Sequence, residues 1–201
     1  MIVLVQHPYE AAREAFAEQV RDADPDAVVP ACPEWTVREL LAHQVHQLQG
    51  ALDRSFPVRA ALNRLAPGSE AERRDAERQQ EAWISRGVAE WSKRTIDGLL
   101  ETWSVLARDA PIEVLDALVP DVVVHLFDLL GVTGVRGYRD HAIVERALSF
   151  WAGAAGVEMP DTVEGRFELL RIVTGRRSRA QAPDVDVRAA LYGWRSDDLV
   201  E

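Results

Sequence analysis

Three polar side chains interrupt an otherwise apolar stretch, and their spacing places them on one face of a helix. The stretch runs from Leu118 to Gly131, and its polar residues are Asp121, His125 and Asp128. Side chains four and then three positions apart stack along a single stripe of a helix. Asp-x-x-x-His at this spacing is a workable pair of metal ligands. The alternative is that the stripe is the solvent-facing seam of the helix.

The rest of this stretch predicts a buried helix. Its remaining positions are nearly all valine, leucine or phenylalanine. A helix that is apolar around most of its circumference is usually buried in a bundle. A buried carboxylate or imidazole must then be hydrogen-bonded, paired or metal-bound, because an unpartnered one costs several kcal/mol. We expect the helix to begin at about Ile112 or Leu118 and to end at Gly131.

Further helices are predicted on both sides from apolar spacing. Thr36 and Glu39 form a capping-box pattern at the start of the second helix. The charged run 70–82 is expected to be a solvated helical face. A short strand is expected around Val185 and Val187. The predicted helices cover residues 8–21, 36–52, 81–107, 140–153 and 167–181, the last of them interrupted at Gly175.

This pattern predicts an all-α protein built on a four-helix bundle. We expect residues 1–158 to form the bundle and residues 159–201 a short C-terminal extension. Bundles place metal sites inside, with ligands on facing helices. His43 on the second helix could therefore join Asp121 and His125, and this set leaves coordination positions open for water or substrate. The alternative makes His43 a surface histidine, which is also our expectation for His46.

Composition narrows the class of protein. The formal net charge of the 201 residues is −10, which argues against a nucleic-acid partner. No apolar run is long enough to span a bilayer, and the start MIVLV lacks a signal-peptide pattern, so we expect no membrane partner and a cytoplasmic location. The lone cysteine, Cys32, forms no intramolecular disulfide. It is a nucleophile or, more commonly, an inert small hydrophobe.

Four ordered segments resemble one known family. VPACPEWTVRELLAH (29–43) is similar to the N-terminal signature of the mycothiol-dependent maleylpyruvate isomerase family, in the DinB-like superfamily. DVVVHLFDLLG (121–131) resembles its second metal segment, GVRGYRD (134–140) the loop that follows, and FELLRIVTGRRSRAQ (167–181) a recurring C-terminal segment. Together the four segments touch most of the chain.

The resemblance implies a DinB-like metal-binding bundle. By position, the divalent metal would be held by His43, Asp121 and His125. The best-known member has glutamate where this chain has Asp121. The metal would be zinc or, as an alternative, nickel. The full isomerase has a separate C-terminal domain, whereas only about 40 residues follow Met159 here.

The implied cofactor besides the metal is mycothiol, the low-molecular-weight thiol of actinobacteria. A coordinated thiol loses its proton and becomes a nucleophile. Its attack on a small electrophilic substrate would give an isomerase or an S-transferase, and we expect a monomer or homodimer. Asp128, one turn beyond His125, would orient that imidazole or a metal-bound water, or it is a surface aspartate. Arg176, Arg177 and Arg179 would bind a substrate or cofactor anion, or form a solvated basic turn.

Three other hypotheses stay open. The chain could be a non-enzymatic metal-binding bundle with a stress or regulatory role. It could be a metal hydrolase that activates water and needs no thiol. It could also be a metal-free bundle whose polar stripe is purely structural.

Overall fold

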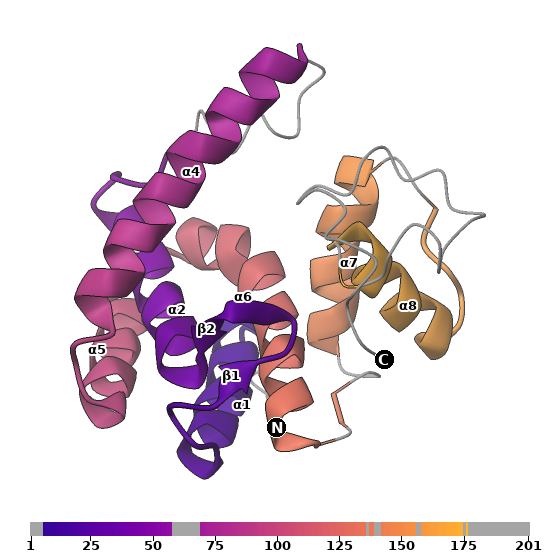
Figure 1. The fold of residues 1–201 in the computed structure, drawn as a ribbon. Helices are drawn as coiled ribbons and strands as arrows, with labels where there is room; N and C mark the ends of the chain where they lie inside the picture. The colour runs from indigo at the N-terminus through magenta and orange to yellow at the C-terminus, as the bar shows by residue number, and fades with distance from the viewer. Residues whose placement is uncertain are drawn as a thin grey trace.

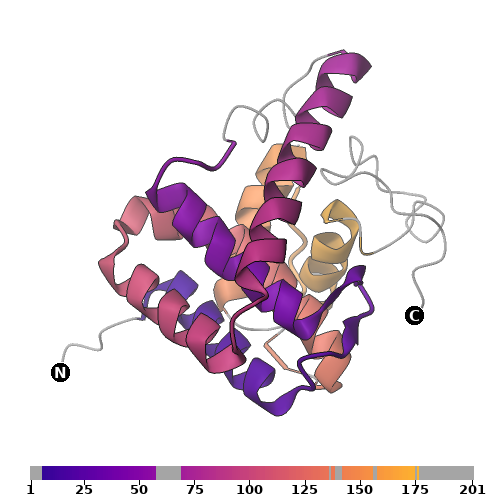
Figure 2. The same cartoon turned by 60° about the vertical axis from the view of Figure 1, so that its left-hand side comes forward.

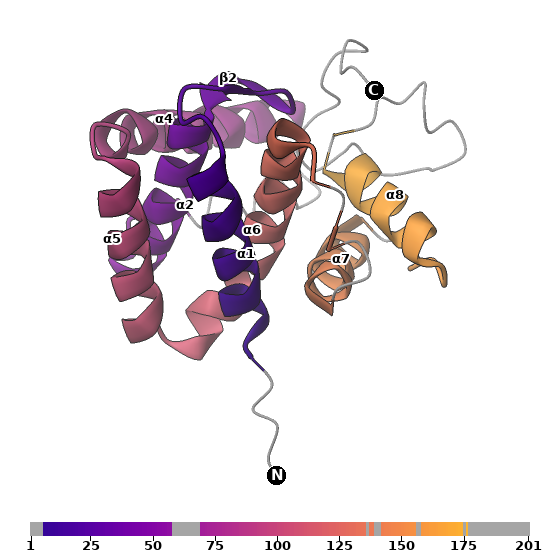
Figure 3. The ribbon, with the colours of Figure 1, turned by 90° about the horizontal axis from the view of Figure 1, so that it is seen from below.

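Four helices form a bundle, and three more pack around it. The computed structural model describes residues 6–57, 69–135, 137–138, 142–155, 158–174 and 176. The bundle helices lie side by side in Figures 1 and 3 and are α1 (Pro8–Asp22), α2 (Val37–Leu52), α5 (Ile96–Asp109) and α6 (Ile112–Thr133). The described strands are β1 (Val28–Val29) and β2 (Cys32–Thr36), an antiparallel pair. The predicted all-α, DinB-like bundle is confirmed.

The three outer helices extend the bundle on opposite sides. α4 (Glu70–Trp91) packs along α2, and its N-terminal half reaches past the bundle (Figures 1 and 2). α7 (Ala142–Ala155) packs on α6 and α1, and α8 (Val163–Val173) packs on α7. None of the helices in the described ranges is long and apolar enough to cross a bilayer.

α6 is the buried central helix, as predicted, but it is longer than expected. It begins at Ile112, directly after Pro111, and it includes Pro120. It continues through Gly131 and ends at Thr133, because Gly134 adopts a left-handed conformation with φ of 70°. Glycine reaches this conformation without steric cost and commonly ends helices.

The predicted helix over residues 81–107 is wrong, because the chain breaks inside it. α4 ends at Trp91 and α5 begins at Ile96, with the Thr95 side chain accepting a hydrogen bond from the Gly98 amide. The apolar spacing runs through the break because both helices turn an apolar face toward α2. The polar residues 92–95 were the available signal for the break.

The remaining boundaries follow their capping residues. The Thr36–Glu39 capping box is confirmed at the start of α2. α8 begins earlier than predicted, after the cap Thr162, and it ends at Val173, just before the predicted interruption at Gly175. The predicted continuation over residues 177–181 lies outside the described residues. α7 lies two residues later than expected. The strand predicted around Val185 and Val187 lies outside the described residues.

Two glycines, one on each helix, allow α2 and α4 to approach closely. The His46 ring stacks on Trp83 with ring centroids 3.8 Å apart, so the expected surface position of His46 is wrong and the residue is half-buried. Gly87 of α4 lies against this ring, and Gly50 of α2 lies against Trp83. Small residues at both points let the two helices meet around one aromatic pair.

Adding a methyl group at Gly87 should therefore destabilise the protein. A Cβ there would lie 2.1 Å from His46 ring atoms, so the stacked pair must shift. We expect Gly87→Ala to lower the free energy of unfolding by about 1–3 kcal/mol in urea denaturation. Gly131→Ala is the matched control, because a Cβ at this helical position meets nothing within 4 Å. It should stabilise the protein by up to about 1 kcal/mol, and equal effects at the two positions would contradict this account of the α2–α4 contact.

Candidate metal centre

The three predicted metal ligands meet where α2 faces α6. His43 comes from α2, and Asp121 and His125 come from successive turns of α6. His43 and His125 are buried, with exposed fractions of 2% and 8%, and Asp121 is partly buried. Asp128 is also buried, at 4%. The stripe is therefore not a solvent-facing seam, and its buried polar groups need partners.

The separations within this group suit one metal ion. Asp121 Oδ2 lies 3.5 Å from His43 Nε2, and Asp121 Oδ1 lies 3.8 Å from His125 Nε2. One ligand atom from each of the three residues lies within 4.8 Å of the others. Ligands bound tetrahedrally at typical zinc distances lie about 3.4 Å apart. Small side-chain rotations would bring all three ligands onto one ion, with further positions open.

Two buried polar atoms beside the group support its fit to a ligand. Among the described residues, His43 Nδ1 and Gln47 Oε1 are buried side-chain atoms without a hydrogen-bond partner. Buried polar atoms nearly always have partners, so such atoms often mark a binding site or a bound water. The Gln47 amide nitrogen lies 3.4 Å from His43 Nε2, and the Gln44 amide donates to Asp121 Oδ2 at 3.0 Å.

The site's electrostatics favour an ionised Asp121 and a protonated His125 when no metal is bound. Burial opposes the charge on Asp121, but the charge of His125 and hydrogen bonds from His43 and Gln44 lower the Asp121 pKa well below its usual value. Burial alone would lower the pKa of His125, but Asp121 and Asp128 raise it to about 10. Burial lowers the pKa of His43, so this imidazole is neutral at pH 7.

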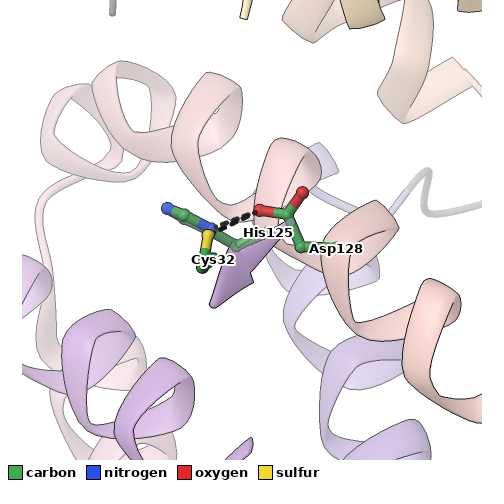
Figure 4. Close-up of side chains that lie close together, drawn as sticks. All are labelled: Cys32, His125 and Asp128. Carbon is green, nitrogen blue, oxygen red and sulfur yellow. Dashed lines mark hydrogen bonds and ion pairs between the residues drawn. The ribbon is translucent and has the colours of Figure 1, made fainter. Parts of the chain in front are cut away.

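Asp128 accepts hydrogen bonds from three side chains. Its Oδ2 accepts from His125 Nδ1 at 2.8 Å and from the Cys32 thiol at 3.6 Å (Figure 4). Arg176 donates to both carboxylate oxygens, through Nε at 3.0 Å and Nη2 at 2.6 Å. Cys32, His125 and Asp128 also bring one ligand atom each within 4.8 Å of one another. Because both Asp128 oxygens are already engaged by Arg176, this group is the weaker candidate for a metal ion. Asp128 instead sets the orientation of the His125 ring.

The other candidate residues fall into distinct environments. Cys32 is 1% exposed and hydrogen-bonded, which favours the inert alternative over a nucleophile. Of the arginines predicted to bind an anion, Arg176 is paired with Asp128, while Arg177 and Arg179 lie outside the described residues.

Trp35, Gln44 and Gln47 lie beside the candidate ligands but were not predicted from the sequence motifs. The Trp35 ring lies 4.9 Å from the His43 ring and 6.0 Å from the His125 ring, measured between centroids. Trp35 lay inside the segment that carried the family resemblance, and Gln47 lies one helical turn after His43. These two positions in the sequence could have indicated that Trp35 and Gln47 lie next to the site.

Comparison with known protein families gives one match. The family model described as the mycothiol maleylpyruvate isomerase N-terminal domain matches residues 8–130, which is more than half of the chain. The chain belongs to this family. The match includes all of α1, α2 and the three candidate ligand positions. No curated protein and no solved structure shows significant similarity to the chain.

Metal binding at this family member's site should strengthen as pH rises. His125, with a pKa of about 10, must lose a proton to offer Nε2 to a cation, whereas the neutral His43 need not. The apparent association constant for zinc should therefore rise about tenfold per pH unit between about pH 7 and pH 9. Competition with a chromophoric chelator at several pH values measures this slope. A zinc association constant that does not change with pH would show that His125 does not have to lose a proton when the metal binds.

Proposed function

We propose that this mycothiol maleylpyruvate isomerase family member is a metal-dependent enzyme that uses mycothiol to attack a small electrophilic substrate. The supporting observation is the buried set of two histidines and one aspartate on facing helices, whose separations suit one ion. The donor set fits zinc, with nickel as the alternative. Mycothiol comes into the proposal from the description of the matching family.

The chain's own residues prepare the site for this chemistry. His43 and His125 would supply ring nitrogens, and Asp121 would supply a carboxylate that offsets part of the cation's charge. A divalent metal bound here would coordinate a thiol and lower its pKa, so that the thiolate is the nucleophile. The Gln44 amide holds the Asp121 carboxylate, and Asp128 holds the His125 ring. Trp35 packs beside both imidazoles and shields them from water.

Two reactions follow from the same attack. When the thiolate adds to a carbon–carbon double bond, that bond becomes single and can rotate. Loss of the thiolate then restores the double bond with changed geometry, which is an isomerisation. When the sulfur–carbon bond persists and the adjacent carbon takes up a proton, the product is a thioether and the reaction is a transfer. The proposal covers both outcomes, because the site residues described here serve the shared first step.

Elemental analysis followed by a thiol-dependence assay tests the proposal. The purified, untagged protein should hold about one divalent metal per chain after zinc is supplied, and should consume an electrophile such as a maleyl compound only when mycothiol is present. Metal without thiol-dependent turnover would support a non-enzymatic metal-binding bundle. Turnover without thiol would support a hydrolase. No metal at all would overturn the metal site and leave a structural polar stripe.

A further inference from the structure

Arg176 reaches the metal centre from beyond the last described helix. It follows α8 by three positions in the chain, and its guanidinium contacts a residue of the central helix α6. The pairing with Asp128 is bidentate, and the Arg176 side chain is 15% exposed. Its Nη1 also donates to the Thr174 carbonyl at 2.6 Å, which fixes the guanidinium relative to its own backbone.

The bidentate contact defines the plane of the Asp128 carboxylate. A guanidinium that donates to both oxygens fixes a carboxylate more tightly than a single contact does, because two parallel bonds restrict its rotation. In this orientation Oδ2 lies 2.8 Å from His125 Nδ1. A carboxylate that holds the second nitrogen of a ligating histidine fixes both the ring angle and the tautomer.

We propose that Arg176 is a positioning residue for the metal centre: it locks Asp128, which orients His125, and so makes metal affinity depend on a residue outside the matched family domain. This inference rests on the proposed function, since it requires His125 to be a ligand. It goes further because it gives Arg176, which follows the last described helix, a part in completing the site. The family match ends at residue 130, 46 positions before Arg176.

The direction in which metal affinity changes when Arg176 is removed distinguishes a positioning role from a purely electrostatic one. The positive charge of Arg176 alone repels a cation, so a residue acting only through charge would strengthen metal binding when removed. Positioning predicts the opposite result, because Asp128 can rotate away from His125 once the guanidinium is gone. We expect Arg176→Met to weaken binding of zinc and cobalt by about tenfold, the range found when partners of metal ligands are removed.

The test is a double-mutant cycle between Arg176 and Asp128. Zinc affinity is measured by chelator competition, and cobalt-loaded protein is examined by visible absorption, which reports the ligand geometry. Arg176→Met should weaken binding and change the cobalt bands in the otherwise natural protein. In the Asp128→Asn background it should change affinity by less than about twofold, because its route to His125 is already lost. Arg176→Lys keeps the charge but loses the paired geometry, so its affinity should be intermediate.

Arg166→Met is the matched control for loss of an arginine near α8. Arg166 Nε donates a hydrogen bond to the Pro160 carbonyl, and Arg166 Nη1 lies 3.8 Å from Glu145 Oε2. Neither partner is one of the candidate metal ligands. The metal affinity and the cobalt absorption bands of Arg166→Met should equal those of the natural protein. If the natural protein binds zinc and Arg176→Met binds it equally or more tightly, the positioning role is wrong and the proposed function stands. If the natural protein binds neither metal, both are wrong.

Discussion

Replacing His125 with alanine is expected to weaken zinc binding by at least about 100-fold. Losing a residue that merely orients a ligand already costs about 10–100-fold, and loss of the ligand itself should cost at least as much. His125 also lies between Asp121 and Asp128, so its removal leaves both carboxylates without that partner. Elemental analysis after dialysis should find metal in the natural protein and almost none in the variant. His43→Ala should give the same result.

His46→Gln is the control for this experiment. His46 lies on α2, as His43 does, but its ring stacks on Trp83 and its Nε2 lies 3.2 Å from the Trp83 carbonyl. Metal content should therefore be unchanged in His46→Gln. Equal metal in His125→Ala and the natural protein would remove His125 from the ligand set, and metal loss in His46→Gln would point to a different site.

Replacing Trp103 with alanine is expected to give the largest loss of stability among the changes considered. Trp103 is fully buried, meets Phe16 edge to face with centroids 5.4 Å apart, and donates from Nε1 to the Tyr9 hydroxyl at 2.8 Å. Truncating a buried tryptophan to alanine costs about 3–5 kcal/mol, because it removes apolar contacts and leaves a cavity. Urea denaturation of metal-free protein measures this loss.

Tyr9→Phe separates the hydrogen bond from the packing. It removes only the hydroxyl that accepts from Trp103 and should cost about 1–3 kcal/mol, because the indole N–H is left buried without its acceptor. Both variants should keep about one metal per folded chain, because these residues lie in the α1–α5 contact and not among the ligands. If Trp103→Ala lowers the free energy of unfolding by less than about 1 kcal/mol, the prediction is wrong and neighbouring side chains fill the space left by the indole.

Two members of the candidate ligand set could be singled out from the sequence because their signals are local. Asp121 and His125 lie on successive turns of a helix whose apolar sequence predicted burial, but the sequence left the polar stripe itself open to being a solvent-facing seam. The structure buries His125 and Asp128 and partly buries Asp121. Helical spacing alone did not decide whether His43 is a surface histidine or part of the metal site. The bundle architecture and the family resemblance together favoured the position that the structure gives it.

The contacts that could not be predicted join distant segments. Arg176 was expected to bind an external anion or to lie in a solvated basic turn, but its partner is the carboxylate of Asp128, 48 positions earlier. Side-chain pairing between a segment after α8 and the middle of α6 leaves no periodic pattern in a single sequence. The break between α4 and α5 was missed for a different reason. Both helices pack on α2, so their apolar residues keep the same helical spacing across the break.

The separation of the ligands along the chain has a consequence for folding. Asp121 and His125 come together as soon as α6 forms its turns, whereas His43 lies 82 positions before His125 and arrives only when α2 docks. An unfolded chain therefore offers a cation at most the local pair, and the complete set exists only late in assembly. A bound cation should act mainly on the rate of unfolding: it should lengthen the lifetime of the native state and leave the rate of refolding nearly unchanged.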